Sequence, residues 1–492
     1  MVTPTDAQFS FVLSAVAIEG ATAFTPAELA PFYADYLAKT VTNVEVEKIA
    51  QTITKAYRDA GYVFSQADAP VQDVLAGVLR IKVTEGYVER IEYADDVSGN
   101  SVVGSYMAPV LAERPTRLAT IERALLLIND LPDVAIGDTS VADGSEDGGK
   151  VLKVALDYSA VNADFYMDNR GTPSSGRLQA WTSAAANGLF GVGNRLQFGV
   201  FTVPDKPQEL IYLQTKWSQP IGPWGTTVEA SVSGSQSNAG ADLEDSDTES
   251  DSFRVHLTLR HPIIRTRNDS LWLLGELDYY DVNEDVSNAV SYQDRNRTAR
   301  IGLEYYRSDL LAGDFYAKAA YDRGFDVMGA KNSQLSRSDG ERQFNLVTLE
   351  LRRLQKLWGG FGLYLQAKGQ WASKPVLSGA EFSVGGSQYG RAYDYGEIAG
   401  DQGAAGSVEL RYTGENPTDW LDSYDLYAFY DGGVVWDAGV ERQVITSAGG
   451  GLRATFALGF YGDVQVAKPL NHEVSTESDK DLRVLFSLGA GL

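Results

Sequence analysis

The sequence lacks cysteine, long apolar runs and any excess of basic residues, and each absence removes a class of protein. With no cysteine among 492 residues, disulfide frameworks and thiolate metal sites are excluded. The formal net charge of −24 argues against a nucleic-acid partner, because a phosphate-binding surface needs clustered lysine and arginine. No stretch of about eighteen strongly apolar residues occurs, so we expect no transmembrane helix.

Histidine is also scarce, and the remaining chemical motifs are incomplete. His256 falls on a polar strand face, His261 beside Pro262 at a turn and His472 in a predicted loop, so no metal-binding or catalytic cluster is indicated. The acidic run Asp242–Asp251 lacks the glycine and the spaced glutamate of a calcium loop, which favours a solvated surface segment.

Nucleotide motifs are incomplete in the same way. Leu196 stands where a dinucleotide fingerprint beginning at Gly191 needs its third glycine, and no P-loop occurs. We therefore expect no nucleotide, no cofactor, no metal and no enzymatic activity.

The first 160 residues contain one small α+β module twice. Periodicity and capping residues predict the order β-α-α-β-β for the first copy, with elements at Phe11–Ile18, Pro26–Leu37, Val44–Ala60, Tyr62–Gln66 and Val78–Val83. The same order returns at Val88–Tyr93, Val102–Leu111, Thr116–Asn129, Val134–Val141 and Val151–Tyr158. We predict domains at 1–87 and 88–160, although taken alone this repeat also fits generic α+β folds.

After residue 160 the chain becomes a series of runs in which apolar and polar residues alternate. Leu257 and Leu259, for example, fall on one face of their run, whereas Arg254, His256 and Arg260 fall on the other. This pattern fits strands with lipid on one side and water on the other, and about sixteen such runs occur. A soluble propeller is the alternative, but no blade-length repeat is present.

Connections between these runs alternate between short and long. Pro220–Gly225 and Ala457–Gly459 are tight, whereas Val282–Arg295 and Ala372–Ala405 are long. Membrane barrels have this asymmetry between short periplasmic turns and longer surface loops. The predicted fold class is mainly β: an antiparallel transmembrane β-barrel of about sixteen strands over residues 161–492, preceded by two small βααββ domains.

The first N-terminal module resembles a known domain family. The first module carries Gly61-Tyr62 after its second helix and closes on Val83-x-Glu85-Gly86, and in these residues it resembles POTRA domains. That resemblance implies periplasmic modules that capture unfolded polypeptide. An open sheet edge can do so, because it offers backbone groups to which an extended peptide adds as a further strand.

Two POTRA-like modules followed by a barrel resemble the two-partner secretion transporters, which export a large adhesin or haemolysin. Gly390-Arg391-Ala392-Tyr393 aligns with the Val-Arg-Gly-Tyr motif of that family's sixth surface loop, with two departures. Here the sixth loop corresponds to the stretch 372–405, after the eleventh predicted strand. The family's Phe-x-Asp-x-Gly motif on its thirteenth strand matches Phe429, Asp431 and Gly433 in full.

The resemblance implies that Arg391, with Tyr393 beside it, is anchored on Asp431 inside the barrel. An arginine fork binds a carboxylate bidentately in a geometry that lysine cannot reproduce. In sequence, Asp431 is expected at the end of its strand. We predict Arg391, Tyr393, Phe429, Asp431 and Gly433 as the anchoring and gating residues.

The implied function is export of an unfolded adhesin-type or haemolysin-type partner across the outer membrane, with the barrel in outer-membrane lipid and the N-terminal domains in the periplasm. The start of the sequence lacks the basic and apolar blocks of a secretory signal, so we expect that a signal was removed. Many relatives carry a helix ahead of the first POTRA domain that plugs the barrel, but only about ten residues precede the first predicted strand here. We expect either that such a plug is lost or truncated, or that the protein relies on its folded-in loop alone.

Two alternatives stay open. The first is an assembly factor of the same superfamily, which inserts other barrels or autotransporters and usually carries more POTRA modules than two. The second is a passive porin-like channel, which would leave the N-terminal modules without a purpose.

Overall fold

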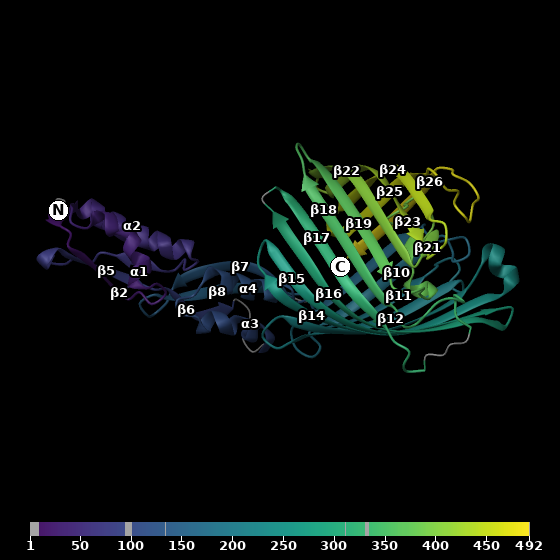
Figure 1. The fold of residues 1–492 in the computed structure, drawn as a ribbon, viewed down its shortest axis with the longest axis horizontal. Coiled ribbons are helices and arrows are strands. Elements are labelled where there is room, and N and C mark those ends of the chain that lie inside the picture. Colours follow the sequence, from purple (N-terminus) through teal and green to yellow (C-terminus); the bar gives the residue numbers. More distant parts are fainter. Residues whose placement is uncertain (1–8, 94–100, 133, 310, 330–333, 492) are drawn as a thin grey trace. The chain divides into compact units, whose positions relative to one another are not determined.

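The computed structural model of the chain describes residues 9–93, 101–132, 134–309, 311–329 and 334–491. The chain forms two compact units, Met1–Tyr158 and Ser159–Leu492, drawn in Figure 1. Within the described ranges, no helix is long and apolar enough to cross a membrane.

The first module of the N-terminal unit has a three-stranded sheet in the order β2-β5-β4, with β2 parallel to β5 and β4 antiparallel to it. Its elements are β1 (Ser10–Val12), β2 (Ala15–Glu19), α1 (Pro26–Leu29), β3 (Thr40–Thr42), α2 (Asn43–Asp59), β4 (Gln66–Asp68) and β5 (Val78–Thr84). Helix α2 begins at a capping box formed by Thr42 and Glu45. Ile49 and Ile53 on its inner face are fully buried with Ile81 of the sheet.

The predicted helix Pro26–Leu37 is wrong beyond its first turn. Only Pro26–Leu29 is α-helical, and two short 3-10 turns follow at Ala30–Phe32 and Ala34–Tyr36. Pro31 explains the break, because proline has no N–H for the helical hydrogen bond and its ring clashes with the carbonyl four residues earlier.

Two strand predictions in this module are also corrected. The predicted strand Phe11–Ile18 is divided into β1 and β2, because the backbone N–H of Leu13 bonds to Lys39 and that of Ser14 to Gly77, so the chain changes partner. The predicted strand Tyr62–Gln66 is instead a turn that packs on the end of α2, and the strand of this region, β4, begins only at its last residue.

The second module repeats this arrangement with the sheet order β6-β8-β7. Its elements are β6 (Tyr87–Tyr93), α3 (Ser101–Ala112), α4 (Leu118–Asn129), β7 (Val134–Asp143) and β8 (Gly149–Tyr158). The two modules contact each other where Arg117 donates to the Tyr62 hydroxyl at 2.8 Å and the Leu118 N–H donates to the Gly61 carbonyl at 2.9 Å.

Sixteen antiparallel strands close the barrel of the C-terminal unit, so the predicted fold class is confirmed (Figure 1). Strand β26 pairs with β9 to complete the wall. In order around the wall the strands are β9 (Val161–Asp168), β10 (Gln179–Asn187), β11 (Arg195–Thr202), β12 (Leu210–Ile221), β13 (Thr226–Asn238), β14 (Thr248–Arg265), β15 (Asp269–Val286), β16 (Ala289–Asp309), β17 (Gly313–Gly324), β18 (Asn345–Lys356), β19 (Phe361–Ala372), β22 (Gln402–Thr418), β23 (Leu421–Trp436), β24 (Gln443–Phe456), β25 (Phe460–Pro469) and β26 (Arg483–Gly491).

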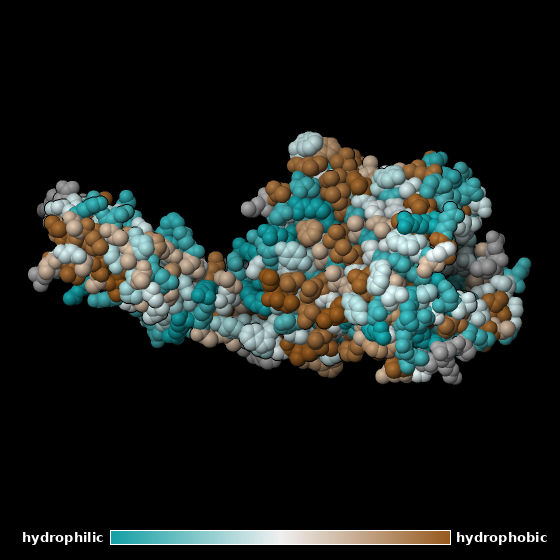
Figure 2. All heavy atoms as spheres, in the orientation of Figure 1, coloured by the Kyte–Doolittle hydropathy of each residue, from teal (hydrophilic) through white to brown (hydrophobic). Residues whose placement is uncertain are grey.

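The two faces of the wall differ as the alternation predicts. Leu257 and Leu259 are 41% and 47% exposed on the outside, where apolar side chains gather on the barrel in Figure 2. Their neighbour Arg254 points inward and pairs with Asp278 of β15 at 2.6 Å. An apolar exterior around a charged, hydrogen-bonded interior is the arrangement of a barrel that stands in lipid and holds water.

One predicted long loop is wrong. In place of a loop at Val282–Arg295, strands β15 and β16 continue as a hairpin and turn tightly at Ser287 and Asn288. Both turn residues have positive φ, 49° and 62°, as a two-residue hairpin turn requires. The sequence concealed this hairpin because its residues are mostly polar on both faces, so the alternation that marks a wall strand is lost.

The predicted sixth loop lies between β19 and β22, the eleventh and twelfth wall strands, and spans residues 373–401. Its boundary at residue 405 is corrected, because β22 already begins at Gln402. Within the loop, β20 (Phe382–Val384) and β21 (Ile398–Gly400) form a small antiparallel sheet. The tip between them is buried against the inner face of β22, β23 and β24.

Candidate functional site

The tip of the loop turns at Gly390, whose φ of 69° lies in the left-handed region that glycine favours. A Cβ at this position would also approach the Ile445 side chain to 2.8 Å. The Val-Arg-Gly-Tyr motif has valine here, and a β-branched residue does not readily adopt this conformation. Glycine in place of the motif's valine therefore suits this turn. The turn points the N–H groups of residues 390 and 391 at the barrel wall.

Those N–H groups meet Asp431, and the structure brings Arg391 and Asp431 together. Arg391 Nε donates to Asp431 Oδ2 at 2.6 Å, with the two side chains 4% and 0% exposed. Asp431 Oδ1 accepts the backbone N–H groups of Gly390 at 3.0 Å and Arg391 at 3.3 Å, and it also accepts the hydroxyl of Ser447. Both oxygens are thus hydrogen-bonded, which offsets the cost of burying the charge.

The expected place of Asp431 at a strand end is wrong, because it lies well inside β23. The apparent end in the sequence comes from Gly432 and Gly433, which resemble a turn but continue the strand. Asp431 is buried, whereas its neighbour Tyr430 is 55% exposed on the outside, so the carboxylate points into the barrel.

The structure adds a second carboxylate that the motifs do not contain. Arg391 Nη1 donates to Glu409 Oε2 of β22 at 2.5 Å, and Nη2 donates to Ser407 Oγ at 2.8 Å. Glu409 also accepts from Arg453 at 2.8 Å and Arg411 at 2.6 Å. Each nitrogen of the Arg391 guanidinium therefore has its own acceptor, which a lysine ammonium could not reproduce.

Phe429 and Gly433 support this contact from the same strand. The Arg391 guanidinium carbon lies 3.7 Å from the Phe429 ring centroid, a cation–π distance. Gly449, opposite Phe429 on β24, leaves room for the ring, since a Cβ there would lie 2.8 Å from it. A Cβ at Gly433 would come within 2.8 Å of Val384, so the missing side chain lets β20 reach the wall.

Tyr393 fixes the next part of the tip. Its hydroxyl donates to the carbonyls of Thr446 and His472, each at 3.1 Å, and thus joins β24 to the connection between β25 and β26. Beside it, Asp394 pairs with Arg483 of β26 at 2.6 Å. Four of the five predicted residues are therefore buried in one cluster beside the half-buried Gly433, and Asp394 and Arg483 extend it.

Ser407, Glu409 and Ser447 are the direct partners of Arg391 and Asp431 that motif reasoning missed. Ser407 and Ser447 are the direct neighbours of Asp431 on β22 and β24, so the three form one row across the inner wall. Small polar residues at inward positions of adjacent strands would have been the signal. This pattern of small polar residues can be recognised only when the strand register is known, and the sequence alone does not provide the register.

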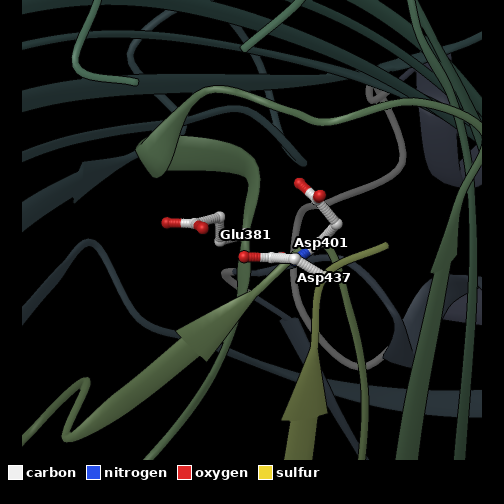
Figure 3. Close-up of side chains that lie close together, drawn as sticks. All are labelled: Glu381, Asp401 and Asp437. Atoms are coloured by element: carbon white, nitrogen blue, oxygen red, sulfur yellow. The ribbon is translucent and has the colours of Figure 1, made fainter. Parts of the chain in front are cut away.

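A second charged cluster joins the loop 373–401 to the residue that follows β23. The carboxylates of Glu381, Asp401 and Asp437, shown in Figure 3, have ligand atoms within 4.8 Å of one another. Such a group could hold a divalent cation, but the Arg337 guanidinium already contacts Asp401 at 2.6 Å and Glu381 at 2.9 Å. Burial raises the pKa of Glu381, an effect that Arg337 opposes.

Comparison with known proteins identifies the family of this chain. The model for the haemolysin secretion/activation protein ShlB/FhaC/HecB matches residues 151–454, and the ShlB-type POTRA domain matches residues 11–86. The chain belongs to this family. The resemblance inferred from motifs is thereby confirmed, and the protein is an outer-membrane transporter of the two-partner secretion type.

Individual proteins are similar to this chain over most of its length. The heme/hemopexin transporter protein HuxB of Haemophilus influenzae is 22% identical over 473 residues, covering 91% of this chain and 81% of HuxB. The outer membrane transporter CdiB of Dickeya dadantii is 22% identical over 424 residues, covering 85% and 75%. The solved structure of CdiB from Escherichia coli matches this chain with a TM-score of 0.82 at 20% identity. The match covers 100% of this chain and 92% of the CdiB chain, so the two share a fold.

Proposed function

We propose that this transporter exports a large adhesin-type or haemolysin-type partner as an unfolded chain through the barrel. Its N-terminal modules lie in the periplasm, and its apolar wall stands in outer-membrane lipid. The observation that carries the proposal is the buried anchor of Arg391, because a loop fixed inside a water-lined barrel by a fully hydrogen-bonded ion pair is a device for controlling passage.

Capture of the client is assigned to the first module. A groove of about 960 Å³ runs between α2 and β4, lined by Val46, Ala50 and Thr54 on the helix side and by residues 66–72 on the strand side. Strand β4 is an edge of its sheet, so an extended polypeptide can add to it through backbone hydrogen bonds. The backbone N–H of Ala67 on this edge donates to the Thr54 hydroxyl at 2.9 Å. A client strand that adds to β4 would take over this N–H.

Neither a nucleotide nor a catalytic reaction enters this mechanism. We infer that the direction of export comes from folding of the client outside the cell, which removes it from the barrel by mass action. The Arg391 loop acts in opening the barrel or in guiding the client.

Secretion by point variants tests the proposal. Arg391→Ala and Asp431→Ala are each expected to leave a folded, heat-modifiable barrel and to reduce secretion of the partner strongly. Arg442→Ala is the matched control, because Arg442 is exposed on the connection after β23 and contacts only the Trp436 ring among the described interactions. Undiminished secretion by both anchor variants would overturn the assigned role of the loop.

Client binding separates export from a passive channel. The purified protein should retain the unfolded N-terminal part of its partner in a pull-down, and Thr54→Val should bind it more tightly because the edge of β4 is freed. A steady large conductance without any polypeptide binding would favour a porin-like channel. Insertion of other barrel proteins by the purified transporter would favour an assembly factor.

A further inference from the structure

The two ends of the loop 373–401 converge on one arginine from a different connection. Arg337 lies between β17 and β18, and its side chain is 15% exposed. Its Nη1 donates to Asp401 Oδ1 at 2.6 Å and to Glu381 Oε1 at 2.9 Å, and also to the Val376 carbonyl at 3.2 Å. Nη2 lies 3.4 Å from Asp437 Oδ2, just beyond the end of β23. One guanidinium therefore holds both the entry and the exit of the loop.

The charges show what this guanidinium contributes to the observed geometry. Glu381, Asp401 and Asp437 come close enough to repel one another, and Asp339 adds a fourth carboxylate at 3.3 Å from Nη2. Without the cation among them, like charges at these distances would drive the segments apart. We call the two ends of the loop, residues 373–381 and 398–401, together with Asp437, the stem; Figure 3 shows its three carboxylates Glu381, Asp401 and Asp437.

Other contacts keep the Arg337 connection in place against the loop. The Glu341 N–H donates to the Pro375 carbonyl at 2.9 Å, and the Ser378 N–H donates to Ser336 Oγ at 3.1 Å. Leu377 is fully buried and packs closely over Gly340, where a Cβ would come within 2.8 Å of it. Arg337 is thus held against the loop by a hydrogen bond on each side of it, one between backbone groups and one to the Ser336 hydroxyl.

We propose that Arg337 is a second anchor, a positioning residue that holds the ends of the loop together and thereby sets how readily the Arg391 tip leaves the wall. The inference rests on the proposed function, because it assumes that the loop moves during export. Release of the stem loosens the loop at the outer end of the barrel while the contacts of Arg391 persist. Arg337 acts at the two ends of the loop and Arg391 at its tip, so the two anchors can be broken separately.

The test uses the full-length protein in planar lipid bilayers and in detergent, without a client. Relative to wild type, Arg337→Ala is expected to raise both the rate of protease cleavage within residues 373–401 and the frequency of channel opening by about fivefold to tenfold. Arg337→Lys should show a smaller increase than Arg337→Ala, since lysine returns the charge without the fork. Lys374→Ala is the matched control, because Lys374 joins the same two connections through an exposed pair with Glu341.

Rescue distinguishes a charge anchor from a merely structural residue. In the Arg337→Ala background, Glu381→Gln together with Asp437→Asn removes the repulsion and should return cleavage and opening towards wild type. Calcium should do the same in Arg337→Ala alone, by occupying the three carboxylates, and should leave wild type unchanged.

Wild-type behaviour of Arg337→Ala, or equal loosening with and without the neutralising changes, would overturn the proposal. Heat-modifiable mobility checks that each barrel is folded, and Arg337→Lys tests the role if the alanine variant does not fold. None of these measurements needs a partner protein, so their failure is distinguishable from a failure of the export function.

Discussion

The tip and the stem of the same loop are both held by an arginine among carboxylates, yet the two anchors are built differently. At the tip, Arg391 binds Asp431 and Glu409, both of which lie on wall strands and are almost completely buried. At the stem, Arg337 is partly exposed and binds Asp401 and Glu381, which lie outside the wall strands. The tip is thus fastened to a rigid frame, whereas the stem joins segments that can separate.

This difference predicts unequal strengths for the two anchors. Breaking a buried ion pair by removing one partner costs about 3–5 kcal/mol, although a hydrated barrel interior lowers the figure. Fully exposed pairs contribute about 0–1 kcal/mol each, and the Arg337 pairs, with side chains 5–15% exposed, lie between these two limits. We therefore infer that the stem loosens first and that the tip provides the main barrier to movement of the loop.

The largest expected effect comes from changing the fork at the tip without removing its charge. Arg391→Lys keeps the cation but cannot serve Asp431, Glu409 and Ser407 together, so the anchored state should lose about 2–4 kcal/mol. The measurement is the rate of protease cleavage in the loop, followed together with partner secretion. Arg411→Lys is the control, because Arg411 also binds Glu409 but does not belong to the loop. Equal effects of both changes would show that the Glu409 network, not the tip, was measured.

The architecture around the tip could be predicted from the sequence because local rules determine it. Alternating wall residues and unequal connections predicted the strand number and the position of the loop, and two motifs placed Arg391 and Asp431 on facing segments. Glu409 and Ser407 could not be predicted, since their contacts depend on the register of β22 against β23.

The stem was invisible to sequence analysis for a different reason. Arg337 carries no motif, and its partners are brought together only by the packing of irregular segments that have no period. The extension of β15 and β16 through residues 282–295 was missed for a related reason, because outside the apolar belt a strand has no face that must be apolar.

An intermediate effect is expected from filling the space that lets the loop approach the wall. Gly433→Ala places a Cβ within 2.9 Å of Val384, Ala404 and Ala405, and such overpacking costs about 1–3 kcal/mol. Strand β20 should move away from β23, which exposes the loop to protease while the Arg391 contacts weaken only in part. Gly275→Ala is the control on β15, where nothing lies within 4 Å of the added Cβ. Cleavage at the control rate would show that β20 can adjust without loosening the tip.

The smallest effect, and the one that separates the stem from the tip most sharply, concerns pH. Burial raises the pKa of Glu381 from its ordinary value of 4.5; Arg337 opposes this shift, and Asp437, Asp401 and Asp339 add to it. A carboxyl group with a raised pKa binds its proton more readily in the folded state, so its contribution to stability falls as pH rises above 4.5. Acidification from neutral pH should therefore slow cleavage at the stem in wild type.

Glu381→Gln should remove this dependence at the stem and should change cleavage at neutral pH by less than about threefold. The measurement is the cleavage rate of both proteins from pH 7 down towards pH 5, with Arg391→Lys compared in parallel because its release should not follow the titration of Glu381. Strong release of the loop by Glu381→Gln at neutral pH would mean that the ionised carboxylate is a required partner of Arg337. The stem would then resemble the tip, and the difference between the two anchors would be one of degree.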